Sequence, residues 1–252
     1  MVNGLIAATV AAFILFILFG ATGFILHGAA RIICAIFFGI AALVLLFYAI
    51  WMGKLHSAFD YNGKRKMAKT IIEGTAMYIN IPEGGVGLDV GCGSGALTIA
   101  CAKRNPSAQM VGCDIWSGSY KAVFTKQLCE ENSKAEGVTN TRFEEGNAIR
   151  LPFQDETFDA VTSNYVYHNI TGKDKQELLL ETLRVLKKGG TFAIHDIMSR
   201  SRYGDMDAFI KKLEAQGYEK VQLIDTTDGM FMKRKEASML GLAGSTLLVG
   251  VK

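Results

Sequence analysis

Hydrophobic residues follow two different patterns along this chain. From Leu5 to Leu26, and again from Ile32 to Met52, the sequence contains no charged side chain. Beyond residue 64, apolar positions instead recur at helical spacing or gather in short runs between polar turns. A helix needs about 20 apolar residues to cross the hydrocarbon core of a bilayer. The pattern therefore predicts two transmembrane helices, over 5–26 and 32–52, followed by a domain that faces water.

The connection between the two apolar segments is short enough for a tight hairpin. It contains Arg31, the only charged residue among the first 53, whereas Lys54, Lys64, Arg65 and Lys66 follow the second segment. Because basic residues concentrate on cytoplasmic loops, both termini are expected in the cytoplasm, with Arg31 outside. A cleaved signal peptide, a buried soluble hairpin, and one span with a re-entrant segment remain as alternatives. A signal peptide would normally have a basic start and one apolar core.

The remaining sequence alternates between strand and helix patterns. Residues 54–63 read as a polar linker, and 64–80 as an amphipathic helix. Expected strands cover 86–90, 109–114, 141–145, 158–163, 191–196, 220–226 and 244–251; expected helices cover 95–104, 118–136, a stretch through Leu179 and Leu186 ended by Gly189 and Gly190, and a stretch from Met206 to Gly217.

Alternation of this kind predicts an α/β fold in which a doubly wound, seven-stranded and mostly parallel sheet carries helices on both faces. The last two strands leave room for an antiparallel strand at one edge. The expected organisation is a transmembrane hairpin over 1–53, a linker over 54–63 and a folded domain over 64–252.

Composition narrows the possible functions. The 252 residues carry a formal net charge of +3 and no long basic run, so nucleic-acid binding is not expected. The five cysteines form no C-x-x-C pair and no metal-ligand spacing with histidine, so no metal site is expected. We interpret them as reduced thiols that pack like small apolar residues. No pattern indicates an oligomeric state.

A glycine-rich stretch, LDVGCGSG, closes the first predicted strand and opens the first predicted helix. Gly91 and Gly93 can take backbone angles that a β-carbon would resist, and they would let a ligand approach the main chain closely. The dinucleotide motif G-x-G-x-x-G is the nearest rival, because Ala96 stands where that motif tolerates alanine, so spacing leaves a nicotinamide cofactor open. Asp89, two residues before the first glycine, favours instead a ligand that carries a cationic amine.

A second acidic residue follows the second predicted strand. Asp114 comes 23 residues after Gly91, at the place where an acid accepts hydrogen bonds from ribose hydroxyls. This position serves either kind of nucleotide.

Two further stretches, EEGNAIRLPFQDETFDAVTSNYVYHNI and RVLKKGGTFAIHD, complete a set of four motifs in order. Together they resemble the class I S-adenosylmethionine-dependent methyltransferases, and within them the ubiquinone/menaquinone methyltransferase-like subgroup. The resemblance covers residues 66–200 well and the last fifty residues only loosely.

This resemblance implies S-adenosyl-L-methionine as the cofactor and assigns roles to its binding residues. The glycine-rich loop would wrap the methionyl part, Asp89 would bind its ammonium directly or through water, and Asp114 would hold the ribose. The full implied set is Asp89, Gly91, Cys92, Gly93, Ser94, Gly95, Asp114, Ile115 against the adenine, Asn147 and Ala148 at the adenine edge, and Ser163 beside the methionyl group. Asn147 departs from the family, which most often has Asp there, although an amide carbonyl can still accept from the adenine amino group.

A general base is needed only if the methyl acceptor must lose a proton. It would project from the loop after the fourth strand, where Tyr165 and His168 are candidates. Packing against the following helix is the competing interpretation for both residues. His195 is expected to be structural.

We therefore expect a methyltransferase at the cell membrane, anchored in lipid through residues 5–52, with its catalytic domain in the cytoplasm. Its acceptor would be a small or lipid-like molecule, an inference from location alone. Two alternatives remain: an NAD(P)-dependent oxidoreductase with a similar sheet, and a non-catalytic protein that binds or senses S-adenosylmethionine.

Overall fold

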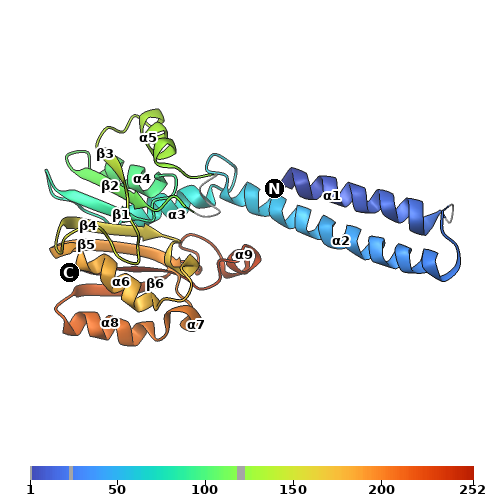
Figure 1. The fold of residues 1–252 in the computed structure, drawn as a ribbon. Helices are drawn as coiled ribbons and strands as arrows, with labels where there is room; N and C mark the ends of the chain where they lie inside the picture. Colours follow the sequence, from blue (N-terminus) through green and yellow to red (C-terminus); the bar gives the residue numbers. More distant parts are fainter. Residues whose placement is uncertain (1, 23–24, 118–122) are drawn as a thin grey trace. The chain divides into compact units, whose positions relative to one another are not determined.

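The computed structural model describes residues 2–22, 25–117 and 123–252 (Figure 1). The chain divides into two compact units, Met1–Ala68 and Lys69–Lys252. The first unit consists of helices, and the second contains a seven-stranded sheet.

The N-terminal unit is a helical hairpin. Helix α1 (Val2–Leu15) continues as a π-helix (Phe16–Ala21) and packs beside the 32-residue helix α2 (Gly28–Phe59). The two helices approach closely at Gly20, where the missing side chain makes room: a β-carbon at this position would lie only 2.5 Å from Cα of Ala35. Arg31 donates hydrogen bonds to the carbonyl oxygens of Gly20 (2.8 Å) and Ala21 (2.7 Å), which the end of the first helix leaves without partners.

The surface of α2 is apolar. Ile33, Phe37, Leu43 and Phe47 are each about two-thirds exposed, at 65, 66, 69 and 65%. Both Asn3–Ala21 and Gly28–Phe59 are long and apolar enough to cross a membrane. Of the first expected span, 5–26, residues 23 and 24 lie outside the described residues.

The expected linker over 54–63 is largely helical, because α2 runs on to Phe59 and ends at Asp60. Gly53 does not stop the helix, and Lys54 to Ala58 contain no proline or further glycine that would. At about 1.5 Å per residue, α2 is ~48 Å long and exceeds the ~30 Å hydrocarbon core.

The second unit contains a seven-stranded sheet in the order β3-β2-β1-β4-β5-β7-β6. Its strands are β1 (Val86–Val90), β2 (Gln109–Asp114), β3 (Thr141–Glu145), β4 (Phe158–Asn164), β5 (Leu186–Ile197), β6 (Glu219–Asp225) and β7 (Ser245–Val251). Strands β1 to β5 are parallel, and β7 lies antiparallel to both β5 and β6. The α/β prediction of a mostly parallel, seven-stranded sheet is confirmed. Strand order reverses between β2-β1 and β4, the position at which such sheets bind ligands.

The helices of this unit are α3 (Met67–Ala76), α4 (Ala96–Arg104), α5 (Lys126–Ala135), α6 (Lys175–Arg184), α7 (Arg200–Tyr203), α8 (Met206–Ala215) and α9 (Arg234–Met239). The expected helices over 64–80 and 118–136 are shorter than predicted, and residues 118–122 of the latter lie outside the described residues. The predicted helix end at Gly189 and Gly190 is wrong. Helix α6 ends at Arg184, and both glycines lie inside β5, where β4 and β5 shift register.

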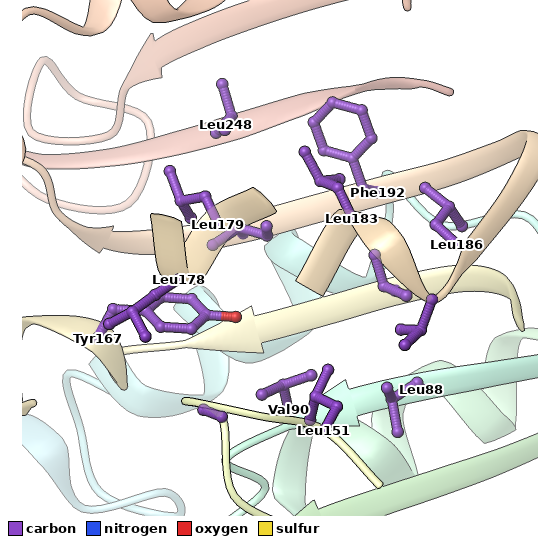
Figure 2. Close-up of a cluster of buried hydrophobic side chains, with 14 of the residues drawn as sticks. Leu88, Val90, Leu151, Tyr167, Leu178, Leu179, Leu183, Leu186, Phe192 and Leu248 are labelled. Carbon is purple, nitrogen blue, oxygen red and sulfur yellow. The ribbon is translucent and has the colours of Figure 1, made fainter. Parts of the chain in front are cut away.

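The core joins α6 and the sheet. Leu179 and Leu183 of α6 are fully buried and belong to the same apolar cluster as Leu88 of β1 and Phe192 of β5. Figure 2 shows these side chains gathered between the helix and the strands, with Leu248 of β7 at one side. This packing fixes the sheet whose carboxyl edge carries the site described below.

The packing around Gly112, in the middle of β2, leaves no room for a side chain at this position. A β-carbon on Gly112 would lie 2.7 Å from Cδ1 of Phe143 and 2.8 Å from Oγ1 of Thr98. We predict that Gly112→Val lowers the free energy of unfolding by roughly 1–3 kcal/mol or more, the usual cost of overpacking a core. Denaturant unfolding measures this, with Gly53→Ala as the control because its β-carbon would meet nothing within 4 Å. Equal stability of the Gly112→Val variant and the parent would contradict this packing.

Candidate active site

A cavity of about 670 Å³ opens at the carboxyl ends of β1, β2 and β4. Its walls are the loop after β1, the residues after β2, the turn after β3, the segment after β4, and Ile72 of α3. The volume lies within the ~300–1,000 Å³ typical of small-molecule sites. The strand-order reversal and the cavity therefore coincide.

The loop after β1 depends on glycine. Gly91, Gly93 and Gly95 have φ of 72°, 55° and 80°, the left-handed region that glycine occupies without strain. A β-carbon on Gly91 would lie 2.4 Å from Cγ2 of Val166 in the segment after β4. A β-carbon on Gly93 would meet only Cδ2 of Phe124, at 3.9 Å, so this side of the loop has space for a ligand.

Asp114 ties this loop to the end of β2. Its carboxylate accepts hydrogen bonds from the backbone N–H of Gly93 (3.0 Å) and of Trp116 (2.8 Å). The indole of Trp116 donates in return to the Gly93 carbonyl at 3.0 Å, and Trp116 lines the cavity. The Asp114 carboxylate thus joins the loop after β1 to the residues after β2.

Asp89 is a buried carboxylate at the end of the central strand. It is 1% exposed and accepts hydrogen bonds from the hydroxyls of Thr98 (2.7 Å) and Thr162 (3.0 Å). Burial raises its pKa to about 7, although the two hydroxyls partly oppose that rise. No Lys, Arg or His is found among the described residues that line the cavity. The site therefore lacks a positive charge opposite Asp89 and suits a ligand that brings one.

The turn after β3 supplies Asn147 and Ala148, which line the cavity together with Ile115 and Ile149. Ile115 and Ile149 are 46% and 41% exposed, so two apolar side chains stand open at the cavity. The side-chain amide oxygen Oδ1 of Asn147 accepts a hydrogen bond from the backbone N–H of Ile149 at 2.9 Å. One of the lone pairs expected to serve a ligand is therefore already used.

Most of the residues predicted to bind the cofactor come together here. Asp89, Gly91, Cys92, Gly93, Ser94, Asp114, Ile115, Asn147 and Ala148 line the cavity. Gly95 and Ser163 are not among its lining residues. Ser163 is fully buried and donates its hydroxyl to the Val90 carbonyl at 2.8 Å, so it joins β4 to β1 instead of facing the cavity.

The two candidate bases differ in position. Tyr165 lines the cavity, but its hydroxyl bonds to Ser245 at 2.8 Å, and burial raises the pKa of that hydroxyl. His168 is not among the lining residues, and its Nδ1 lies 2.5 Å from the buried carboxylate of Asp196. Burial of Asp196 favours its neutral form, yet hydrogen bonds from His168 and Ile197 hold its pKa below the usual value.

Several lining residues were not predicted from the sequence. They are Ile72, Leu97, Trp116, Phe124, Asn164, Val166, Asn169, Ile170 and Thr171. Asn164 ends β4, and residues 165–171 follow it directly. Their position after a strand whose carboxyl end meets the site is the sequence feature that could have identified them. Ile72 and Phe124 come from distant parts of the chain, and only the folded structure places them here.

Comparisons with known proteins agree with this geometry. The sequence matches the methyltransferase-domain family over residues 88–194. Demethylmenaquinone methyltransferase of Geobacillus stearothermophilus is 27% identical over 210 residues, covering 79% of this chain and 85% of that protein. The enzyme of the same name from Anoxybacillus flavithermus is 36% identical over 117 residues, 46% of each chain.

Two solved structures share the fold. Geranyl diphosphate methyltransferase in complex with GPP and sinefungin aligns with a TM-score of 0.56 at 13% identity, covering 78% of this chain and 84% of that one. The [4+2]-cyclase SpnF aligns with a TM-score of 0.56 at 19% identity, covering 77% and 84%. At such identities the likeness establishes the fold alone.

The sheet, the glycine loop and the family match together define a class I S-adenosylmethionine-dependent methyltransferase. Residues 88–194 match the methyltransferase-domain family, and demethylmenaquinone methyltransferases are among the proteins that this chain is similar to. Its residues fit S-adenosylmethionine, since the cavity holds a buried carboxylate without a cation and a glycine loop open to the ligand. The nicotinamide alternative left open by the glycine spacing has no support in these matches.

The raised pKa of Asp89 makes stability depend on pH. Asp89 is protonated in the folded state up to about pH 7 but ionises near ~3.8 when unfolded, so its stabilising contribution is present at low pH and is lost as pH rises through about 7. We predict that, without ligand, the stability of the parent relative to Asp89→Asn falls by a few kcal/mol between about pH 4 and pH 7. Denaturant unfolding of both proteins across this range measures it. A constant difference would contradict the assignment.

Proposed function

We propose that the protein is a membrane-anchored methyltransferase whose acceptor is an uncharged, lipid-like molecule of the quinol type. The proposal rests on the side chains that line the cavity beyond Asp89 and Asp114, none of which is basic among the described residues. The segment after β4 contributes Val166, Ile170 and Thr171 to the lining, and α3 contributes Ile72. With no basic side chain among the described lining residues, a phosphorylated or carboxylated acceptor would find no partner there.

The anchor supports an acceptor that resides in lipid. Exposing side chains such as Phe37 and Leu43 of α2 to water would be unfavourable by about 25 cal/mol per Å² of apolar surface. Burial in a bilayer removes that cost, and a helix satisfies its backbone hydrogen bonds internally, as lipid requires. We infer that 5–26 and 32–52 span the membrane, with both termini and the catalytic domain on the cytoplasmic side.

Several curated relatives, those of Geobacillus stearothermophilus and Anoxybacillus flavithermus among them, carry the name demethylmenaquinone methyltransferase, which favours a quinol acceptor here. Seven residues, 60–66, separate the end of α2 from the start of α3, and an extended chain of that length spans at most ~25 Å. A connection this short is compatible with an acceptor that resides in the bilayer.

We assign the cofactor-binding roles as follows. Asp89 would take the ammonium, Asp114 the ribose hydroxyls, and Ile115 one face of the adenine. The loop from Gly91 to Gly95 would surround the methionyl part, and Asn147 with Ala148 would meet the adenine edge. Ser163 is assigned no contact, since its hydroxyl is used by Val90.

S-adenosylmethionine supplies an activated methyl group on a sulfonium, so the protein mainly positions the reactants. Orientation of this kind can account for roughly 7–11 kcal/mol of a reaction barrier. The loop after β1 and the segment after β4 meet at Gly91 and Val166, which brings the two halves of the cavity together. A proton lost by the acceptor would leave through water, because the candidate base His168 does not line the cavity and its Nδ1 is held by Asp196.

Replacing Asp114 tests the cofactor assignment. We predict that Asp114→Ala weakens S-adenosylmethionine binding at least about 100-fold, because charge-assisted hydrogen bonds to ribose are lost and the Gly93 loop is released. Calorimetry on the full chain in detergent measures the affinity. The control is Glu83→Ala, an exposed residue outside the cavity. Unchanged affinity of the Asp114→Ala variant would contradict the assignment.

Methyl transfer in vesicles tests the acceptor. We predict that the full chain, reconstituted in phosphatidylcholine vesicles, methylates an isoprenoid naphthoquinol dissolved in the bilayer and leaves phosphoethanolamine unmodified. Transfer from radiolabelled cofactor is the measurement, with Asp114→Ala as the inactive control. Preferential methylation of the phosphorylated compound would overturn the proposed acceptor class.

A further inference from the structure

Asn164, the last residue of β4, lines the cavity. Its carbonyl oxygen Oδ1 lies 2.9 Å from Nδ1 of His195 in β5. Nε2 of the same imidazole lies 2.9 Å from the hydroxyl of Thr226. A polar chain therefore runs from the interior of the sheet to the cavity wall.

The protons along this chain can be assigned. His195 is fully buried, and burial lowers its pKa to about 4, so the ring is neutral at physiological pH with one N–H. An amide oxygen only accepts, so Nδ1 carries the proton and Nε2 accepts from Thr226. The Thr226 hydroxyl also lies 2.9 Å from the Ser245 carbonyl, which accepts the Thr226 N–H at 3.2 Å as well. The hydroxyl has a single proton, and because Nδ1 donates to Asn164 and leaves Nε2 as an acceptor, that proton goes to His195 and not to Ser245.

The other end of the Asn164 amide is its NH₂ group. No described residue accepts a hydrogen bond from it, although the Asn164 side chain borders the cavity. Because His195 fixes the carbonyl end, the amide cannot rotate freely to exchange its donor and acceptor ends. The Asn164 amide therefore presents its N–H donors in a fixed orientation at the cavity wall.

We propose that the Asn164 amide binds an oxygen atom of the methyl acceptor, with His195 and Thr226 as the positioning residues that orient it. This inference rests on the proposed function and deepens it, since it specifies an acceptor with a hydroxyl or carbonyl oxygen next to the methylated atom. Methylation forms a bond between the acceptor atom and the methyl carbon and breaks the methyl–sulfur bond. The bonding pair stays on sulfur, and one proton leaves the acceptor for water.

Negative charge accumulates on the acceptor oxygen as its proton departs. An N–H donor held at that oxygen stabilises the charge, and removal of one such donor typically costs about 10²–10³-fold in kcat. The buried relay prevents the amide from presenting its carbonyl oxygen, which would repel the developing charge. Asn164 therefore selects oxygen-bearing acceptors and accelerates their methylation.

The test uses Asn164→Asp in the full chain, with the naphthoquinol in phosphatidylcholine vesicles as the probe. Aspartate keeps the size of the side chain and an oxygen for His195, but it has no donor for the acceptor. We expect kcat to fall roughly 100-fold, with KM changed little and affinity for S-adenosylmethionine within about twofold of the parent. Asn62→Asp, an exposed amide in residues 60–66, is the matched control and should retain full activity.

The relay is tested at Thr226. Thr226→Val removes the hydroxyl proton that keeps His195 in the required tautomer, so kcat should fall about tenfold at unchanged cofactor affinity, while Thr226→Ser should restore it. Equal kcat for Asn164→Asp and the parent, or no rescue by Thr226→Ser, would overturn this inference alone. If the parent binds the cofactor but methylates no naphthoquinol, the proposed function fails and this inference with it.

Discussion

A carboxylate buried without a cation at the end of the central strand is the constraint on which this structure depends. Asp89 is held by two threonine hydroxyls, and burial brings its pKa to about 7. Retaining such a group is unfavourable unless a partner neutralises it. A ligand with an ammonium supplies that partner, and the neighbouring glycine loop leaves space for it. The Asp89 carboxylate therefore has no positively charged partner among the described lining residues until the cofactor binds.

Contacts between neighbouring strand ends connect the cofactor half of the cavity to the rest of the sheet edge. Asp114 holds the Gly93 loop against the end of β2, and Val166 from the segment after β4 packs on Gly91. Each contact joins one strand end to the next, so the cofactor half and the β4 half of the cavity are mechanically linked. His195 continues this linkage to β5, because its two nitrogens connect Asn164 with Thr226. A ligand that shifts one strand end would affect all of them.

Much of the fold was predictable, because the strands of a doubly covered sheet are short apolar runs between turn residues. Residues 86–90, 109–114 and 141–145 are strands from end to end. The start of β5 was missed, because Gly189 and Gly190 are typical of a helix end yet here allow a strand irregularity. Motif spacing located Asp89 and Asp114. It did not locate Ile72 or the relay behind Asn164, since those depend on contacts between distant segments. Ser163 was misjudged because the alternation that buries a strand residue also turns it from the cavity.

Proton release on cofactor binding tests the central claim most directly. Calorimetric titration of the full chain with S-adenosylmethionine at pH 6, in two buffers of different ionisation enthalpy, counts the protons exchanged. If Asp89 accepts the ammonium, binding at pH 6 releases close to one proton in the parent and none in Asp89→Asn, and the release disappears well above pH 7. Binding without proton release at pH 6, or no binding at all, would contradict the account.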